Sequence, residues 1–217
     1  MERSYKQIAC TWIETLLSTM ICAVGVCLFI EAGIGSDPID VLIDGMHRYF
    51  AISIGQADQL YSFGFLLLAL LCNRRYVGMP SIAYTVLIGF AIDWMHHYIA
   101  PFDLSNKSYL LRMVFICIGQ ICCSISYAIF QTVEKGMNSL DAFLYFLKDK
   151  TQLSYPVLRT IFDCTFCVIG LVLGGIVGVG TLFSACITGL MTYRFTQLIL
   201  IFKRRFLGYG IVKEERS

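Results

Sequence analysis

The sequence predicts an all-α integral membrane protein, a polytopic bundle of membrane-spanning helices, and three observations support this class. Hydrophobic residues make up 57% of the 217 residues and charged residues only 15%, whereas a soluble domain has about 25% charged residues. The apolar residues form runs of about twenty, the length of a helix that crosses ~30 Å of hydrocarbon. Basic residues gather between alternate runs. We therefore expect one integral membrane domain over residues 1–217, with the lipid bilayer as its first partner.

Six apolar runs are expected to span the membrane. They cover about residues 8–30, 55–72, 80–99, 109–133, 155–176 and 181–202. The first run resembles a secretory signal, but it is too long, contains Glu14 and is not followed by a small-x-small cleavage site. We interpret it as a retained anchor.

The lysine and arginine positions predict the orientation of the bundle. With a cytoplasmic N-terminus, twelve of them fall in cytoplasmic segments, and only Arg48, Lys107 and Arg112 fall outside. This bias follows the positive-inside rule and predicts that both termini face the cytoplasm. The net charge of +2 gives no support to nucleic-acid binding.

The stretch GIGSDPID, residues 33–40, interrupts the apolar pattern directly after the first run. Asp37 suits a helix N-cap, Pro38 suits the first helical position, and Asp40 follows three residues after the cap. Over residues 39–50, apolar residues follow helical spacing, with Asp40 and Asp44 among the polar residues of the opposite face. We expect a short amphipathic helix that lies at the interface or dips back into the protein.

A second polar break follows the fourth run, about a hundred residues later. At an offset of 101 residues, the aligned pairs are Gly35 and Gly136, Asp37 and Asn138, Asp40 and Asp141, and Ser53 and Ser154. Each half, at about residues 8–100 and 109–202, therefore contains a span, a polar break, a short helix and two further spans, and the second short helix is expected over residues 140–150. Three spans per half make the halves inverted in the membrane. Inverted repeats with interrupted helices are typical of secondary transporters.

The polar and glycine positions of both halves resemble a known family. In the second half these are Asp141, Ser154-x-x-x-x-Arg159, Asp163, the run Gly174-Gly175-Ile-Val-Gly-Val-Gly-Thr181, and Gly189. In the first half they are Gly33-x-Gly35, Pro38, Asp40-Val-Leu42, Ser53-x-Gly55 and Gly78. Over residues 8–202 the chain resembles the YczE-like family of bacterial membrane proteins, grouped with YyaS and YitT proteins. The resemblance implies a multi-pass protein of the bacterial plasma membrane.

The chain departs from this family at two places. Such proteins commonly have Gly-Pro-Arg-Asp where this chain has Met137-Asn138-Ser139-Leu140-Asp141, and a proline where it has Leu190. The missing arginine bears on any ligand that the family shares.

Ionisable residues inside apolar runs are candidates for function because their burial is costly. Arg159 and Asp163 lie four residues apart on one helix face, either as a local ion pair or as a pair that binds a ligand with Asp141. Asp93, beside Trp94, is expected in an outer interfacial belt. The candidate ligand-binding residues are Asp37, Asp40, Asn138, Asp141, Arg159 and Asp163.

Glycines and cysteines are expected to be structural. The ten cysteines lack the spacing of a zinc site, so we expect neither a metal nor a cofactor, and no catalytic constellation indicates an enzyme. Small residues permit close helix approach and tight turns. The glycines assigned this role are Gly33, Gly35, Gly78, Gly136, Gly174, Gly175, Gly178 and Gly180.

Two functions remain open from the sequence. The first is a transporter or permease component for a small polar solute, suggested by the duplicated polar breaks in inverted halves. The second is a non-transporting accessory protein that assists another membrane or biosynthetic system through its basic cytoplasmic tail. A homo-oligomer or a partner membrane protein fits either function.

Overall fold

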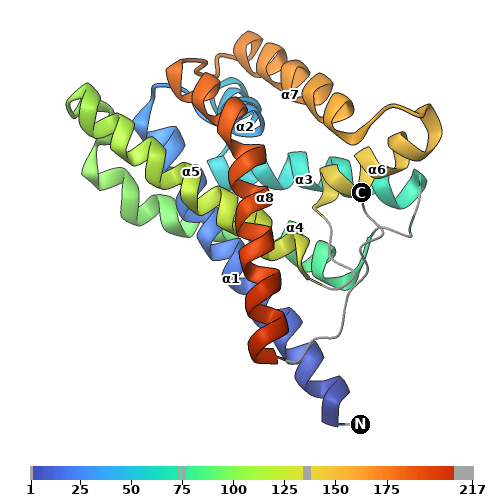
Figure 1. The fold of residues 1–217 in the computed structure, drawn as a ribbon. Coiled ribbons are helices and arrows are strands. Elements are labelled where there is room, and N and C mark those ends of the chain that lie inside the picture. Colours follow the sequence, from blue (N-terminus) through green and yellow to red (C-terminus); the bar gives the residue numbers. More distant parts are fainter. Residues whose placement is uncertain (1, 73, 75–76, 134–137, 208–217) are drawn as a thin grey trace.

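The fold was analysed in a computed structural model that describes residues 2–72, 74, 77–133 and 138–207 (Figure 1). The described residues form eight α-helices and two short 3-10 helices and contain no strand. The α-helices are α1 (Glu2–Ala32), α2 (Pro38–Phe50), α3 (Ile54–Cys72), α4 (Met79–Ile99), α5 (Tyr109–Gln131), α6 (Ser139–Thr151), α7 (Tyr155–Val172) and α8 (Val179–Leu207).

Five of these helices are long and apolar enough to cross a membrane, judged by length and composition: α1, α3, α5, α7 and α8. The expected sixth span coincides with α4, which has 21 residues but falls outside this set. Its last two turns carry Asp93, His96 and His97, which lower its hydropathy. The expectation of six spans is therefore confirmed for five helices only.

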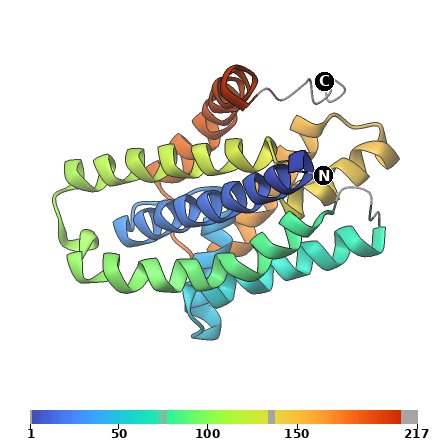
Figure 2. The ribbon, with the colours of Figure 1, turned by 90° about the horizontal axis from the view of Figure 1, so that it is seen from below.

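The central layer consists of α1 between α4 and α5 (Figure 2). In this view α1 and α5 run in opposite directions. A Cβ added at Gly25 of α1 would lie 2.9 Å from the carbonyl oxygen of Gly119 of α5, so the two helices approach closely here. Ser18 and Ser126 tie them together further along, since each hydroxyl donates to the other residue's carbonyl oxygen, at 3.0 and 2.8 Å.

The two short helices differ in burial, since α2 lies largely inside the molecule and α6 buries only Ser139, Leu140, Ala142 and Leu144. α2 packs against α7, and α6 packs against α3. Nine of the thirteen residues of α2 are buried, including Asp40 and Asp44. The expected amphipathic helix exists, but its polar face is turned into the protein, so the alternative in which it dips back is the correct one.

The hydrophobic core lies between the α1–α4–α5 layer and the short helices. Phe29 from α1, Ile43 from α2, Ile88 from α4, Ile116 from α5 and Leu140 from α6 are all less than 2% exposed. This core holds the first turn of α2 against helices of both halves.

The helix pattern recurs along the chain at the expected spacing. Adding 101 to the bounds of α2, residues 38 and 50, gives 139 and 151, the bounds of α6. Both short helices end at a residue in the left-handed region, Ala51 at φ 53° and Gln152 at φ 60°. The packing recurs as well, because α1 with α4 corresponds to α5 with α8, and α2 with α7 corresponds to α6 with α3.

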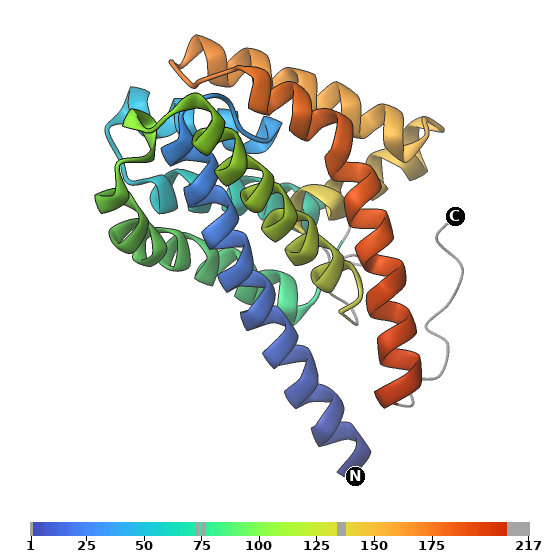
Figure 3. The same cartoon turned by 60° about the vertical axis from the view of Figure 1, so that its left-hand side comes forward.

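One packing pair does not recur. α3 and α4 pack tightly where Gly55 faces Gly89. α7 and α8 diverge from the turn that joins them (Figure 3). Gly189 corresponds to Gly89 at an offset of 100, but a Cβ added there would have no atom of the described residues within 4 Å.

Where they are described, the glycines predicted to be structural lie in turns, at a helix cap or at close backbone contacts. Gly35 has φ +100° and packs against the backbone of Gly178. The nitrogen of Gly180 donates to the carbonyl oxygen of Ile34 at 3.0 Å. Gly33 and Gly174 also have positive φ, Gly175 lies against Val41 of α2, and Gly78 is the N-cap of α4. Gly136 lies outside the described residues.

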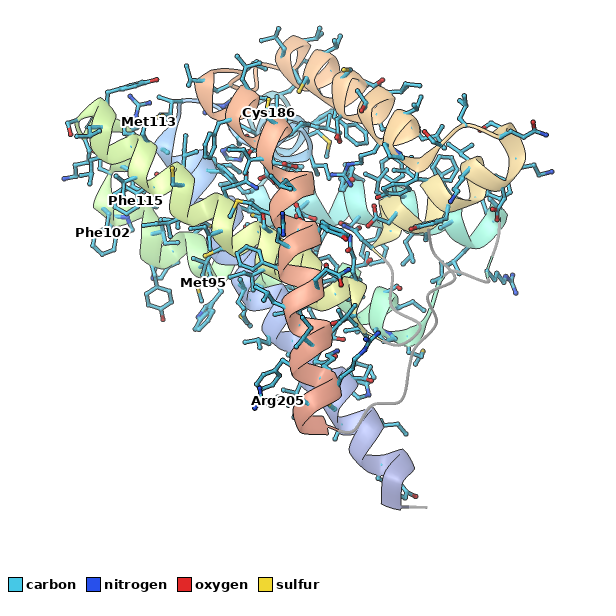
Figure 4. The ribbon with its side chains drawn as sticks, in the orientation of Figure 1. Met95, Phe102, Met113, Phe115, Cys186 and Arg205 are labelled. Atoms are coloured by element: carbon cyan, nitrogen blue, oxygen red, sulfur yellow. The ribbon has the colours of Figure 1, made fainter. Side chains whose placement is uncertain are left out.

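The start of α1 and the end of α8 lie at the same end of the molecule. Lys203 Nζ of α8 donates to Glu14 Oε2 of α1 at 2.7 Å. Arg205 lies near this end, whereas Phe102 lies at the opposite end of the central layer (Figure 4). The basic residues at the end of α8 therefore lie on the side of the N-terminus.

Candidate functional site

The start of α2 holds two buried carboxylates, Asp37 and Asp40, here called the carboxylate pair. Asp37 is the N-cap residue, Pro38 begins the helix, and Asp40 lies in its first turn, as predicted. The exposed fractions are 3% for Asp37 and 1% for Asp40. Asp37 makes no side-chain capping hydrogen bond, which differs from the predicted role of its carboxylate. The position of Asp37 thus suits a cap, while its carboxylate remains available for other contacts.

On one side, the carboxylate pair meets polar side chains of α5 and α8. Thr188 Oγ1 lies 3.2 Å from Asp37 Oδ1 and accepts from Gln120 Nε2 at 2.9 Å, while Ser184 Oγ donates to Gln120 Oε1. The single hydroxyl proton of Thr188 can also go to the carbonyl oxygen of Ser184, at 2.7 Å. These two acceptors compete for one proton, so Asp37 Oδ1 is incompletely satisfied by this network.

The second oxygen of each carboxylate has no hydrogen-bond partner. Among the described residues, Asp37 Oδ2 and Asp40 Oδ2 are buried and accept no hydrogen bond. Burying a carboxylate without partners is costly, and the positive end of the α2 dipole offsets only a part of that cost. Burial therefore raises the pKa of both carboxyls, and that of Asp40 is raised further by the neighbouring Asp37 charge.

The second polar break contributes an ion cluster that we call the Arg159 cluster: Asp141, Tyr155, Arg159 and Asp163. Arg159 Nε donates to Asp163 Oδ1 at 3.0 Å, and Arg159 Nη1 contacts Asp141 Oδ1 at 3.4 Å. Tyr155 Oη donates to Asp141 Oδ1 at 2.7 Å. The local ion pair is therefore present, and Arg159 also reaches Asp141. Ligand binding by this cluster stays a prediction.

The carboxylate pair and the Arg159 cluster are electrostatically connected. The positive charge of Arg159 offsets part of the rise in the pKa of Asp37. Residues from breaks about 101 positions apart are thus brought close enough for their charges to interact. Asn138 is the exception: it occupies the N-cap of α6 without a side-chain capping bond, and no hydrogen bond among the described residues links it to the cluster.

Helix α3 adds Tyr61, which the sequence did not single out, and Asp58, one of the ionisable residues inside the apolar runs. The Tyr61 hydroxyl is buried and has no hydrogen-bond partner among the described residues. It lies within electrostatic range of Arg159. The Tyr61 ring packs against Phe166 at 5.7 Å between centroids. Asp58 is buried and accepts a hydrogen bond from Ser62 at 2.8 Å.

Gln120, Ser184 and Thr188 were also missed. The available signal was the spacing of Ser184, Thr188 and Thr192 at intervals of four, which puts three hydroxyls on one face of α8. Hydroxyls in an apolar helix are common, however, and Gln120 carried no sequence pattern.

Other candidate polar residues have structural roles. Asp93, expected in an interfacial belt, accepts hydrogen bonds from Ser53 Oγ at 2.6 Å and from the Gly55 nitrogen at 2.8 Å. It therefore also connects α4 to the start of α3. Asp44 accepts from Arg48 Nε and from the Ile176 nitrogen, at 2.8 and 3.0 Å. Among the described residues, no group of three or more His, Cys, Asp or Glu side chains is arranged to hold a metal ion.

The fold and this site define an integral membrane protein with a polar, acidic site buried among its helices. The chain belongs to a family of unknown function (DUF6198), whose model matches residues 9–197. It is 22% identical over 193 residues to the uncharacterized protein YyaS of Bacillus subtilis (strain 168), covering 88% of this chain and 94% of that protein. The predicted resemblance to the YczE-like group is thereby confirmed.

Two further relatives agree with this assignment. An uncharacterized protein of Haemophilus influenzae (strain ATCC 51907 / DSM 11121 / KW20 / Rd) is 26% identical over 184 residues, covering 85% of this chain and 82% of that protein. The uncharacterized membrane protein YczE of Bacillus subtilis (strain 168) is 22% identical over 187 residues, covering 86% and 85%. No solved structure matches the chain.

Proposed function

We propose that this protein is a transporter or permease component for a small polar solute, and that the carboxylate pair is part of its solute site. One observation carries the proposal: Asp37 Oδ2 and Asp40 Oδ2 are buried hydrogen-bond acceptors without a partner among the described residues. Intramembrane ionisable groups that are not paired usually line a pathway or bind a ligand. The proposal includes no enzymatic activity.

The proposed architecture is six spans in two inverted repeats, with α4 as the sixth span. It is supported by the recurrence of helix bounds at an offset of 101, by the matched packing pairs and by the opposite directions of α1 and α5. Two features support α4 as the sixth span: it packs beside α1, and it is 21 residues long, enough to cross a bilayer. The site then lies where the repeats meet, as in transporters with interrupted helices.

The proposed location is the bacterial plasma membrane, with both termini in the cytoplasm. The lysine and arginine bias supports this orientation, as does the contact between Glu14 and Lys203, which keeps the start of α1 beside the end of α8. The accessory function depended on the basic tail, and residues 208–217 lie outside the described residues. No contact in the described part of the chain favours that second function.

A thermal-shift screen tests the proposal. A solute that binds only the folded state raises the unfolding temperature of the purified protein, by an amount that grows with its concentration. We expect at least one small polar solute to stabilise the wild-type protein and to lose this effect in the double variant Asp37→Asn/Asp40→Asn. The control variant Asp103→Asn changes an exposed carboxylate in the α4–α5 connection and should keep the response. An undiminished response in the double variant would contradict the assignment of the site.

A further inference from the structure

The charges around the carboxylate pair do not balance. Arg48 pairs with Asp44, and Arg159 pairs with Asp163 and Asp141. Among the described residues, no ion pair reaches Asp37, Asp40 or Asp58, although all three are buried. The titratable groups that interact with the pair are Cys22 and Cys27 of α1, Asp44 of α2, Asp58 of α3, Cys123 and Tyr127 of α5, and Arg159, Asp163 and Cys167 of α7. Arg159 is the only cation of this group, and it is already engaged by two carboxylates.

The unpartnered atoms are all acceptors or can accept. Asp37 Oδ2 and Asp40 Oδ2 need donors, and the buried Tyr61 hydroxyl, which also has no partner among the described residues, can accept or donate. A ligand that completes the site therefore brings positive charge and N–H or O–H donors. An ammonium group brings both, because it carries one positive charge and up to three donors.

We infer that the solute is a small organic cation whose ammonium group donates hydrogen bonds to Asp37 Oδ2 and Asp40 Oδ2. This inference rests on the proposed function, since it names the chemical class of the transported solute. A carboxylate-bearing or phosphate-bearing solute fits less well, because it would add negative charge to a site with an excess of carboxylates. A metal ion fits less well because the described residues hold no three-ligand group.

The aromatic residues beside the site are consistent with an organic cation. Tyr127 of α5 interacts electrostatically with both Asp37 and Asp40. Tyr61 of α3, which lies within electrostatic range of Arg159, packs with Phe65 and Phe166, at 5.0 and 5.7 Å between ring centroids. Aromatic rings attract ammonium groups and accommodate the alkyl carbons attached to them.

The inference predicts a definite pH dependence. The ammonium ion binds the ionised carboxylates, whereas protons bind the same oxygens and compete with it. Because burial raises the pKa of Asp37 and Asp40, this competition begins above the usual range of an aspartate. The affinity for a cation that does not titrate should therefore rise as the pH is raised from the ordinary aspartate range through the raised pKa values of the pair.

Three small probes of similar size test the inference on the purified full-length protein. Ethylammonium chloride, acetamide and sodium acetate have nearly the same size and differ in charge, and sodium chloride matches the ionic strength. Ethylammonium at about ten times its Kd should raise the unfolding temperature by about 3–6 °C. Tetramethylammonium, which has the charge without N–H donors, should give a smaller rise that increases with pH.

Matched variants locate the effect. Asp37→Asn and Asp40→Asn keep the side-chain volume and remove a charge. Each should therefore weaken ethylammonium binding and raise its apparent Kd by about tenfold or more. Asp44→Asn is the matched control, because Asp44 is buried in the same helix but both of its oxygens have partners. Asp44→Asn is expected to lower the unfolding temperature and to keep the ethylammonium response.

Each outcome has a distinct meaning. A response to ethylammonium that both pair variants reduce supports the inference. A response to acetamide or acetate through the pair, with none to ethylammonium, overturns the ammonium class and leaves the proposed function standing. No response to any ammonium ion also overturns the inference. A response that persists in both pair variants would move the cation site elsewhere and contradict the proposed site as well.

Discussion

The two short helices, α2 and α6, have the same length and corresponding positions, yet their first-turn carboxylates differ in their hydrogen-bond partners. Both have 13 residues, and both carry an aspartate at the third helical position, Asp40 in α2 and Asp141 in α6. Asp141 has a tyrosine donor at 2.7 Å and an arginine at 3.4 Å. Asp40 is almost fully buried with an oxygen that has no partner among the described residues. The helix bounds thus recur in both halves, while the surrounding helices determine which partners each carboxylate has.

This difference has a physical origin in the helices that pack on each carboxylate. α7 follows α6 directly and supplies Tyr155 and Arg159 to Asp141. The corresponding helix after α2 is α3, where the same offset gives Ile54 and Asp58. An apolar residue and a further carboxylate replace the two donors. The first half therefore has an unbalanced acidic site, and the second half has a satisfied ion cluster.

The largest expected effect tests the proposed inverted arrangement of the halves. In a variant whose exposed native cysteines are replaced by serine, Lys107→Cys should react with a membrane-impermeant maleimide in intact cells. Lys150→Cys, at the end of α6, should react only after permeabilisation, because positive segments face the cytoplasm. Labelling of Lys150→Cys in intact cells would break the comparison, since α2 and α6 would then lie on the same side.

The next effect concerns the packing that holds each short helix. A Cβ at Gly170 would lie 2.5 Å from the carbonyl oxygen of Val41, so Gly170→Ala must separate α2 from α7. We expect a loss of about 1–3 kcal/mol in the free energy of unfolding. Gly64→Ala is the control, because a Cβ added at Gly64 in α3 would have no described neighbour within 4 Å. Equal unfolding temperatures for the two variants would contradict the close α2–α7 contact.

A third prediction compares the two aspartates directly. Asp141→Asn weakens a charge-assisted network and should destabilise the protein by about 1–2 kcal/mol. Asp40→Asn removes a buried carboxylate without a cationic partner, so it should be neutral or stabilise by up to about 1 kcal/mol near neutral pH. Chemical denaturation in detergent measures both changes. A larger loss for Asp40→Asn than for Asp141→Asn would reverse the comparison.

The smallest effect is a pH dependence of stability without solute. Because the folded-state pKa values of Asp37 and Asp40 lie above the ordinary value of ~3.9, folding favours their protonated forms. Their stabilising contribution is complete below that ordinary value and is lost as the pH rises through the raised pKa values. As the pH rises from the ordinary aspartate range through these raised pKa values, the unfolding temperature should therefore fall more steeply in the wild type than in Asp37→Asn/Asp40→Asn. The same slope in both proteins would remove this support for the site.

Much of the helix pattern could be predicted from the sequence. The start of α2 followed from the capping residue Asp37 and from Pro38, and the short helix at residues 140–150 matched α6 within one residue at each end. Local capping and hydrophobic length are encoded in neighbouring residues, so they can be recognised without tertiary contacts. The equivalence of Asp40 and Asp141 was also visible from their spacing.

The surroundings of the site could not be predicted in the same way. Asp40 and Asp44 were expected on a polar face, but α7 and the turn before α8 cover that face through Gly170 and the Ile176 nitrogen. Thr188 meets Asp37 across 151 positions of sequence, and Gln120 meets Thr188 across 68. Such long-range contacts depend on how helices cross, which periodicity does not determine. The same limit applies to α4. Asp93 lowers the hydropathy of this helix, and its hydrogen bond to the Gly55 nitrogen at the start of α3 is visible only in the fold.

Transport through the start of α2 is the central claim, and solute uptake into proteoliposomes tests it most directly. The measurement compares the wild type with Asp37→Asn/Asp40→Asn and with Asp103→Asn, using a radiolabelled form of the solute that stabilises the wild type most strongly. We predict uptake above that of protein-free liposomes for the wild type and Asp103→Asn, and loss of that uptake in the double variant, with all three proteins folded. Equal uptake by the double variant and the wild type would contradict the account and reduce residues 33–40 to a bend between two helices.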